Sequence, residues 1–129
     1  MGYESMVFVV ERKEIQPLNG MPMWVHGDEI ARFDLCKMGW EQIGGKSFSG
    51  VFDEPIDFDL YVDRDTAERV DCYGDECKMT SVERVMFWLE NSEVLKEYRR
   101  AQLFYDFLKA LRAREQDFGS GLVLVHYGY

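Results

Sequence analysis

The run from residue 71 to residue 83 constrains the fold most, because the hydrophobic pattern changes there from strand-like to helix-like. Cys72 and Cys77 flank a Tyr-Gly-Asp triplet, which predicts a tight turn with Gly74 at positive φ. The Thr-Ser-Val-Glu run at 80–83 then matches a capping box, in which Thr80 would be the N-cap. We therefore expect strands before this run and helices after it.

The first part of the chain contains three strand-like patterns. Residues 6–10 are apolar and mostly β-branched, which predicts a buried central strand. Residues 16–22 hold two prolines and an Asn-Gly pair, so we expect a loop or hairpin there, anchored to the core by Trp24. Alternation over residues 29–38 favours a strand, with a helix as the alternative. The clearest alternation covers residues 56–63 and predicts a strand that buries one face.

The second part predicts helices and one returning strand. Apolar residues at helical spacing from 82 to 89 indicate a short helix that ends at Asn91-Ser92. A longer pattern predicts a second helix from about Ser92 to Glu115, and residues 122–125 form a last buried strand. Residues 1–129 should form a single α+β domain. We expect a mainly antiparallel sheet of about four to six strands, two C-terminal helices on one face and a final strand beside the first.

Charge is concentrated in residues 53–77, which we call the acidic segment. It has ten acids and two bases, so it carries −8 of the net charge of −9. Such a field repels the nucleic acid backbone and attracts basic partners. We therefore expect no direct binding of duplex nucleic acid and a basic protein surface as the partner. The expected partner-binding residues are Asp57, Asp59, Asp63, Asp65, Asp75 and Glu76.

The carboxylates of Asp57, Asp59 and Asp63 fall on one face of the predicted strand, which leaves three interpretations. They could hold a divalent cation, or act as an acid and a base in a metal-dependent hydrolase. They could also be a solvated face whose like charges discourage sheet pairing, which is the interpretation we favour. No spacing in the chain matches a known catalytic geometry, so we expect no enzyme, cofactor or metal.

Two further groups of residues could carry chemistry. Arg99 and Arg100 could bind phosphate, as in a protein that sequesters nucleotides, or pair with acids of a partner or of the acidic segment itself; we favour the last. Cys36, Cys72 and Cys77 could bind zinc with His26 or His126, but ordinary buried thiols explain them more simply. The Gly-Lys-Ser at 45–47 follows Gly39 by one residue too many for a phosphate loop, and residues 48–52 resemble a strand or loop.

Sequence features also predict the compartment. No apolar run is long enough to span a bilayer, and the N-terminal residues lack the basic region of a secretory signal. An odd number of cysteines argues against a secreted disulfide framework. We expect a cytoplasmic protein without membrane contact, and exposed strand edges would permit a homodimer.

Several short motifs together resemble small proteins encoded by bacteriophages and prophages. They are the N-terminal Met-Gly-Tyr-Glu-Ser, residues 31–37, the turn at 73–75, the Trp-Leu-Glu at 88–90, the Tyr-Arg-Arg at 98–100 and residues 125–128. The group has no assigned activity to transfer. The resemblance implies a host bacterial cytoplasm and action by binding to a host or phage protein, including anti-defence inhibition of the anti-CRISPR kind.

Overall fold

The structure is a computed structural model of the 129-residue chain. It describes residues 5–15, 18–21, 23–35, 45–63, 66–118 and 121–128. Its strands are β1 (Ser5–Ile15), β2 (Trp24–Asp34), β3 (Glu54–Pro55), β4 (Leu60–Asp63), β5 (Thr66–Glu68), β6 (Lys78–Thr80) and β7 (Leu122–Gly128). Its helices are α1 (Gly45–Ser49), α2 (Val82–Glu90), α3 (Val94–Glu97), α4 (Arg99–Ala113) and α5 (Glu115–Phe118). None of the helices in these ranges is long and apolar enough to cross a membrane.

The main sheet has five strands in the order β2-β1-β7-β6-β3, and β4 pairs with β5 in a separate ribbon. Every pairing between these strands is antiparallel. The last strand lies beside the first, with Val7 opposite His126. The predicted α+β fold, with about four to six strands and a final strand in the sheet, is therefore confirmed.

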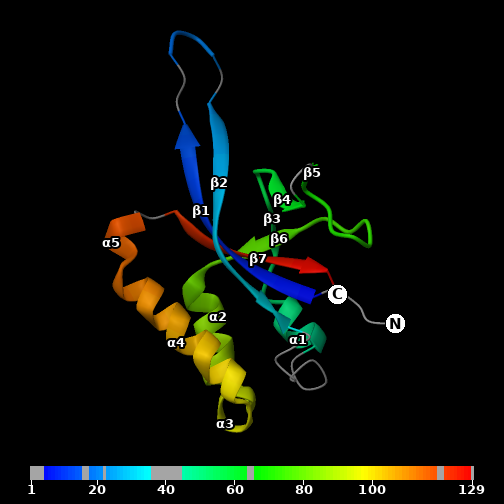
Figure 1. The fold of residues 1–129 in the computed structure, drawn as a ribbon, viewed down its shortest axis with the longest axis vertical. Coiled ribbons are helices and arrows are strands. Elements are labelled where there is room, and N and C mark those ends of the chain that lie inside the picture. The colour runs from blue at the N-terminus through cyan, green and yellow to red at the C-terminus, as the bar shows by residue number, and fades with distance from the viewer. Residues whose placement is uncertain are drawn as a thin grey trace.

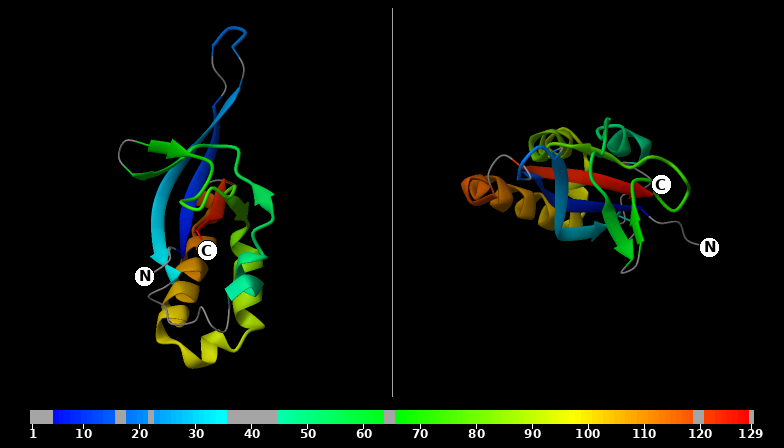
Figure 2. Two further views of the ribbon diagram at one scale, coloured as in Figure 1. Left: turned by 90° about the vertical axis from the view of Figure 1, so that its right-hand side faces the viewer. Right: turned by 90° about the horizontal axis from the view of Figure 1, so that it is seen from above.

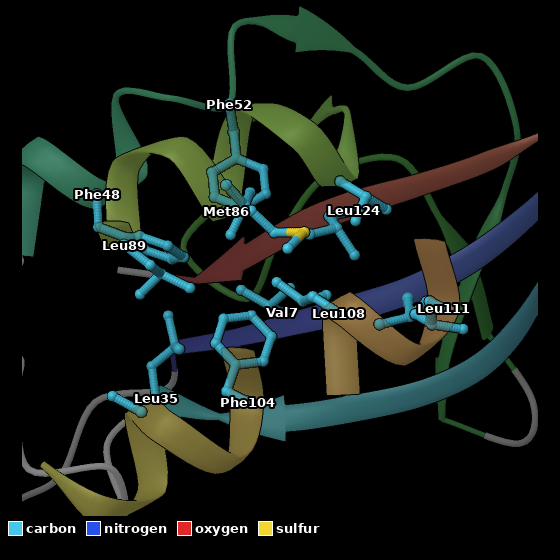
Figure 3. Packing of buried hydrophobic residues seen from close by; sticks show 14 of the residues in the cluster. Val7, Leu35, Phe48, Phe52, Met86, Leu89, Phe104, Leu108, Leu111 and Leu124 are labelled. Atoms are coloured by element: carbon cyan, nitrogen blue, oxygen red, sulfur yellow. The ribbon is translucent and has the colours of Figure 1, made fainter. Parts of the chain in front are cut away.

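One face of the sheet is covered by the helices. Val7 and Val9 of β1 and Leu124 of β7 point into this core, as their two-residue spacing requires. Figure 3 shows these strands facing α2 and α4, and the shared core also holds Phe48, Phe52, Met86, Leu89, Phe104, Leu108 and Leu111. In Figure 1 α2 runs away from the sheet, α3 turns the chain, and α4 returns toward it.

The opposite face of the sheet is covered by the start of the acidic segment. Phe8 and Val10 alternate with the residues of the helix-side core, and they pack with Ile56, Phe58 and Leu60. This second core explains why residues 7–10 are completely buried: β1 is covered on both faces. The structure thus has a sheet between a helical layer and an irregular acidic layer.

Residues 56–63 are not one strand, contrary to the sequence prediction. β3 ends at Pro55 and β4 begins at Leu60, with a bend at residues 57 and 58. The alternation of burial was nevertheless predicted correctly, because Ile56, Phe58 and Leu60 are buried and Asp59 is exposed. A segment that crosses a sheet face can show the same two-residue alternation as a paired strand.

The predicted helix from Ser92 to Glu115 is broken at Tyr98, which is extended (φ −120°, ψ 117°). The Tyr98 carbonyl still accepts the first hydrogen bond of α4, from Gln102 N. The Gln102 side chain donates to Leu95 O at 2.7 Å and so satisfies a carbonyl that the break exposes. Neither proline nor glycine marks this break in the sequence.

Two other local predictions are corrected. The N-cap of α2 is Ser81, whose hydroxyl accepts from Arg84 N at 3.2 Å, because Thr80 is used as the last residue of β6. Residues 45–49 are helical, and Phe48 and Phe52 insert into the helix-side core instead of forming a strand. The turn at 73–75 is confirmed, with Gly74 at φ +83°.

Candidate functional site

Phe58 holds the acidic segment against the sheet. Its ring lies over Gly27 of β2, where an added Cβ would come within 2.5 Å of Phe58 Cδ2. Only a glycine allows this approach, because carbon atoms in contact normally stay about 3.5–4.0 Å apart. The packing fixes the carboxylates on either side of Phe58 relative to β1 and β2.

Asp57 is held by Arg12 of β1. Arg12 Nε donates to Asp57 Oδ1 at 3.0 Å, and Arg12 Nη2 donates to Oδ2 in a paired, fork-like arrangement. These hydrogen bonds lower the pKa of Asp57 below its usual value, although partial burial opposes the shift. Asp57 therefore carries its negative charge next to a fixed positive one.

The neighbouring aspartates are also paired with arginines. Arg69 Nε donates to Asp59 Oδ1 at 3.0 Å. Arg84 Nη1 donates to both oxygens of Asp53 at 2.8 Å, and these bonds lower the pKa of Asp53. Within the part of the chain that the structure describes, Arg12, Arg69 and Arg84 thus hydrogen bond to aspartates of the acidic segment.

Arg99 and Arg100 are not brought to the acidic segment, contrary to the interpretation that we favoured from the sequence. They are the first two residues of α4 and are exposed. Figure 1 shows that this end of α4 lies at the bottom of the helical layer, whereas the acidic segment lies beside the sheet. A sequence cannot predict which arginines meet which acids when they lie 31 and 45 positions apart, as Arg84–Asp53 and Arg12–Asp57 do.

Asp71 organises the turn that carries Asp75 and Glu76. The buried Asp71 carboxylate accepts from Tyr73 N at 2.8 Å and from Asp75 N at 3.0 Å. This leaves the side chains of Asp75 and Glu76 exposed. Asp65 and the side chain of Asp63 lie outside the described residues. Asp75 and Glu76 are the remaining predicted partner-binding acids, and both are open to solvent.

The predicted alternatives for metal chemistry are spread through the fold. Cys77 is buried as expected, but Cys72 is exposed, contrary to the expectation of buried thiols, and Cys36 lies outside the described residues. His26 is in β2 and His126 is in β7. Within the described ranges, His, Cys, Asp and Glu side chains form no group of three or more with the geometry of a metal site.

The β1–β2 hairpin forms a feature that the sequence did not suggest as functional. Figures 1 and 2 show its tip reaching well beyond the rest of the molecule. We define the hairpin tip by its described residues 18–21, 23 and 24. Leu18, Met21, Met23 and Trp24 are 86%, 67%, 56% and 48% exposed, so Trp24 does not anchor the loop in the core as predicted. The available signal was the cluster of large apolar residues around an Asn-Gly turn.

A small cleft joins the hairpin to the acidic segment. It is lined by residues 24–27 of β2 together with Asp59 and Tyr61, and its volume is about 160 Å³. Tyr61 is 59% exposed. The apolar tip and the acidic segment are therefore parts of one continuous surface.

No family model matches the chain, and comparisons with curated proteins and with solved structures gave no significant match.

Proposed function

We propose that the protein acts by non-enzymatic binding, in which the hairpin tip and the acidic segment engage a basic, partly apolar surface of another protein. The observation that carries this proposal is the cluster of four large exposed apolar side chains on a projecting hairpin next to the acidic segment. Single exposed apolar residues are common on soluble proteins, whereas a cluster rimmed by charge is typical of an interaction surface.

The two parts of this surface would contribute differently. Burying a Leu, Met or Trp side chain stabilises a complex by about 1.5–3 kcal/mol, so the four tip residues together could offset much of the entropy cost of association. The charge of −8 on the acidic segment would steer a basic partner and speed the encounter. Association should therefore weaken with added salt, while the apolar contribution persists.

The resemblance to phage-encoded proteins supports a host or phage protein as the partner, met in the host bacterial cytoplasm. Anti-defence inhibition is the role we propose in that setting. Metal-dependent hydrolysis gains no support from the geometry, because Asp57 and Asp59 are engaged by arginines. Nucleotide sequestration through Arg99 and Arg100, which are exposed at the start of α4, stays the alternative proposal.

The test is capture from bacterial lysate at low salt, followed by binary binding with the purified captured protein. The tip variant combines Leu18→Ser with Met21→Ser, and the charge variant combines Asp75→Asn with Glu76→Gln. All four side chains are exposed, so these changes should not affect folding. Leu103→Ser on α4 is the matched control, since Leu103 is 61% exposed and lies on the helical layer.

We expect capture of a basic protein whose affinity falls in the tip and charge variants and stays unchanged in Leu103→Ser. Equal affinity for all variants, or a partner that is not basic, would contradict the proposal. Light scattering of the isolated protein tests the homodimer predicted from exposed strand edges. A dimer that the tip variant dissociates would assign the apolar tip to self-association instead.

A further inference from the structure

The cleft between β2 and the acidic segment has two aromatic walls. Trp24 and Tyr61 both line it, and each residue is about half exposed. Trp24 meets His26 edge to face, with ring centres 5.9 Å apart and planes at 85°. Large aromatic side chains left open to solvent in a shared cleft offer ring faces to a ligand.

A carboxylate completes the lining. Asp59 borders the cleft, and its Oδ1 accepts from Arg69 Nε. A carboxylate has about four acceptor positions on its two oxygens, so Asp59 can accept a second cationic donor without losing Arg69. Asp28 follows the cleft residues along β2 and hydrogen bonds to His26 Nε2 at 2.6 Å.

The two walls are held at a fixed separation. Gly27 is part of the cleft lining, and the ring of Phe58 packs directly on it. Phe58 is fully buried and immediately precedes Asp59. The backbone at Asp59 is therefore held beside β2, so this part of the cleft is formed before a ligand arrives, which reduces the entropy cost of binding.

We propose that this cleft binds the cationic end of an arginine or lysine side chain presented by a basic protein partner. The inference rests on the proposed function and names the group recognised at that surface. Aromatic faces attract an organic cation within about 6 Å of the ring centre, and a nearby carboxylate adds a charge-assisted hydrogen bond. This chain already makes such a contact internally, because the Arg32 guanidinium lies 4.8 Å from the centre of the Phe8 ring.

Size and charge argue against other occupants. The volume of about 160 Å³ is smaller than the roughly 300–1,000 Å³ typical of small-molecule pockets. A nucleotide or other phosphate compound would place its charge against the Asp59 carboxylate. A single cationic side chain fits both the small volume and the negative surroundings.

The test is titration of isotopically labelled protein with octa-arginine, octa-lysine and an octapeptide of citrulline, which has the shape of arginine without its charge. The readouts are the dissociation constant and the indole N–H signal of Trp24, assigned separately from the other tryptophans. We expect the cationic peptides to bind and shift the Trp24 signal, and the citrulline peptide to do neither. Comparison of the two cationic peptides distinguishes guanidinium from ammonium recognition.

The decisive variants are Trp24→Leu and Tyr61→Leu, which keep an apolar side chain but remove the ring. Each should weaken binding of the cationic peptide roughly three- to tenfold. Phe87→Leu on α2 is the control, because Phe87 is an exposed aromatic residue outside the cleft. Its affinity should equal that of the wild-type protein, and circular dichroism should show the same fold for all variants.

Two results would overturn the inference, and they differ in what they say of the proposed function. Salt-sensitive binding that Trp24→Leu and Tyr61→Leu leave unchanged, with no shift of the Trp24 signal, contradicts the cleft and leaves binding by the wider acidic surface intact. Absence of binding by either cationic peptide at low salt contradicts both the cleft and the proposed function.

Discussion

Replacing Gly27 with alanine should destabilise the protein through the Phe58 ring. The added methyl carbon would lie 2.5, 2.9 and 3.0 Å from Phe58 Cδ2, Cε2 and Cγ, about 1 Å inside normal carbon contact at the closest atom. The ring cannot avoid it without moving in the second core. Overpacking of this kind costs about 1–3 kcal/mol of unfolding free energy.

A double-mutant cycle isolates this contact. Phe58→Ala alone should cost about 3–5 kcal/mol because it empties a buried site. It also removes all three clashing atoms, so Gly27→Ala in that background should be neutral or stabilising by about 0.5–1 kcal/mol, since alanine loses less chain entropy than glycine in a strand. The effect of Gly27→Ala should therefore reverse sign or vanish.

Urea denaturation followed by circular dichroism measures each free energy by linear extrapolation. Phe104→Leu provides the control background, because Phe104 belongs to the core on the other face of the sheet. Gly27→Ala should cost the same there as in the wild-type protein. If Gly27→Ala lowers the free energy of unfolding by the same amount in the Phe58→Ala background as in the wild-type protein, the contact between Gly27 and Phe58 does not hold the acidic segment to the sheet.

Four further substitutions test local interactions by the same denaturation assay. Asp57→Asn should lower stability by about 0.5–1 kcal/mol at pH 7, because it removes one of the two carboxylates that pair with Arg12 at a partly exposed site and leaves only Glu14. The pKa of Asp57 is lower in the folded protein than in the unfolded chain, where it is about 3.9. The Asp57 carboxylate therefore contributes its full stabilisation above the unfolded pKa and loses it as the pH falls through the folded pKa. The difference in unfolding free energy between Asp57→Asn and the wild-type protein should shrink in acid. Ser81→Ala should lower the free energy of unfolding by about 1 kcal/mol, because it removes the N-cap of α2. Thr80→Val should be neutral or stabilising, because the buried Thr80 hydroxyl has no hydrogen-bond partner within the described chain. A larger loss of stability from Thr80→Val than from Ser81→Ala would show that Thr80 is the N-cap. Asp71→Ala should cost about 1–3 kcal/mol by removing the acceptor for two backbone amides in the turn, and no loss of stability would show that the turn forms without it.

The parts of the fold that could be predicted are those with local causes. β-branched runs at the two ends of the chain predicted β1 and β7, and helical spacing after residue 82 predicted α2 and its end at Asn91. The break at Tyr98 could not be predicted, because neither proline nor glycine marks it in the sequence. Thr80 and Ser81 both suit an N-cap, and only the pairing of β6 decides between them.

The candidate site was predictable in charge but not in arrangement. Counting acids located the acidic segment, yet the ion pair of Asp57 with Arg12 joins residues 45 positions apart. Trp24 and Tyr61 line the same cleft although they belong to β2 and β4, which do not pair with each other. The apolar tip was visible as residues around an Asn-Gly turn, but only the length of the hairpin shows that they project beyond the body of the protein.

Hydrogen–deuterium exchange of the protein, alone and with its purified captured partner, tests binding by the hairpin tip and the acidic segment most directly. The account predicts slower exchange in peptides that cover residues 18–24 and the acidic segment, with no change at the start of α4. Two results would contradict binding by the tip and the acidic segment. One is protection confined to α4 around Arg99 and Arg100, and the other is a stable complex in which no peptide outside the helical layer is protected.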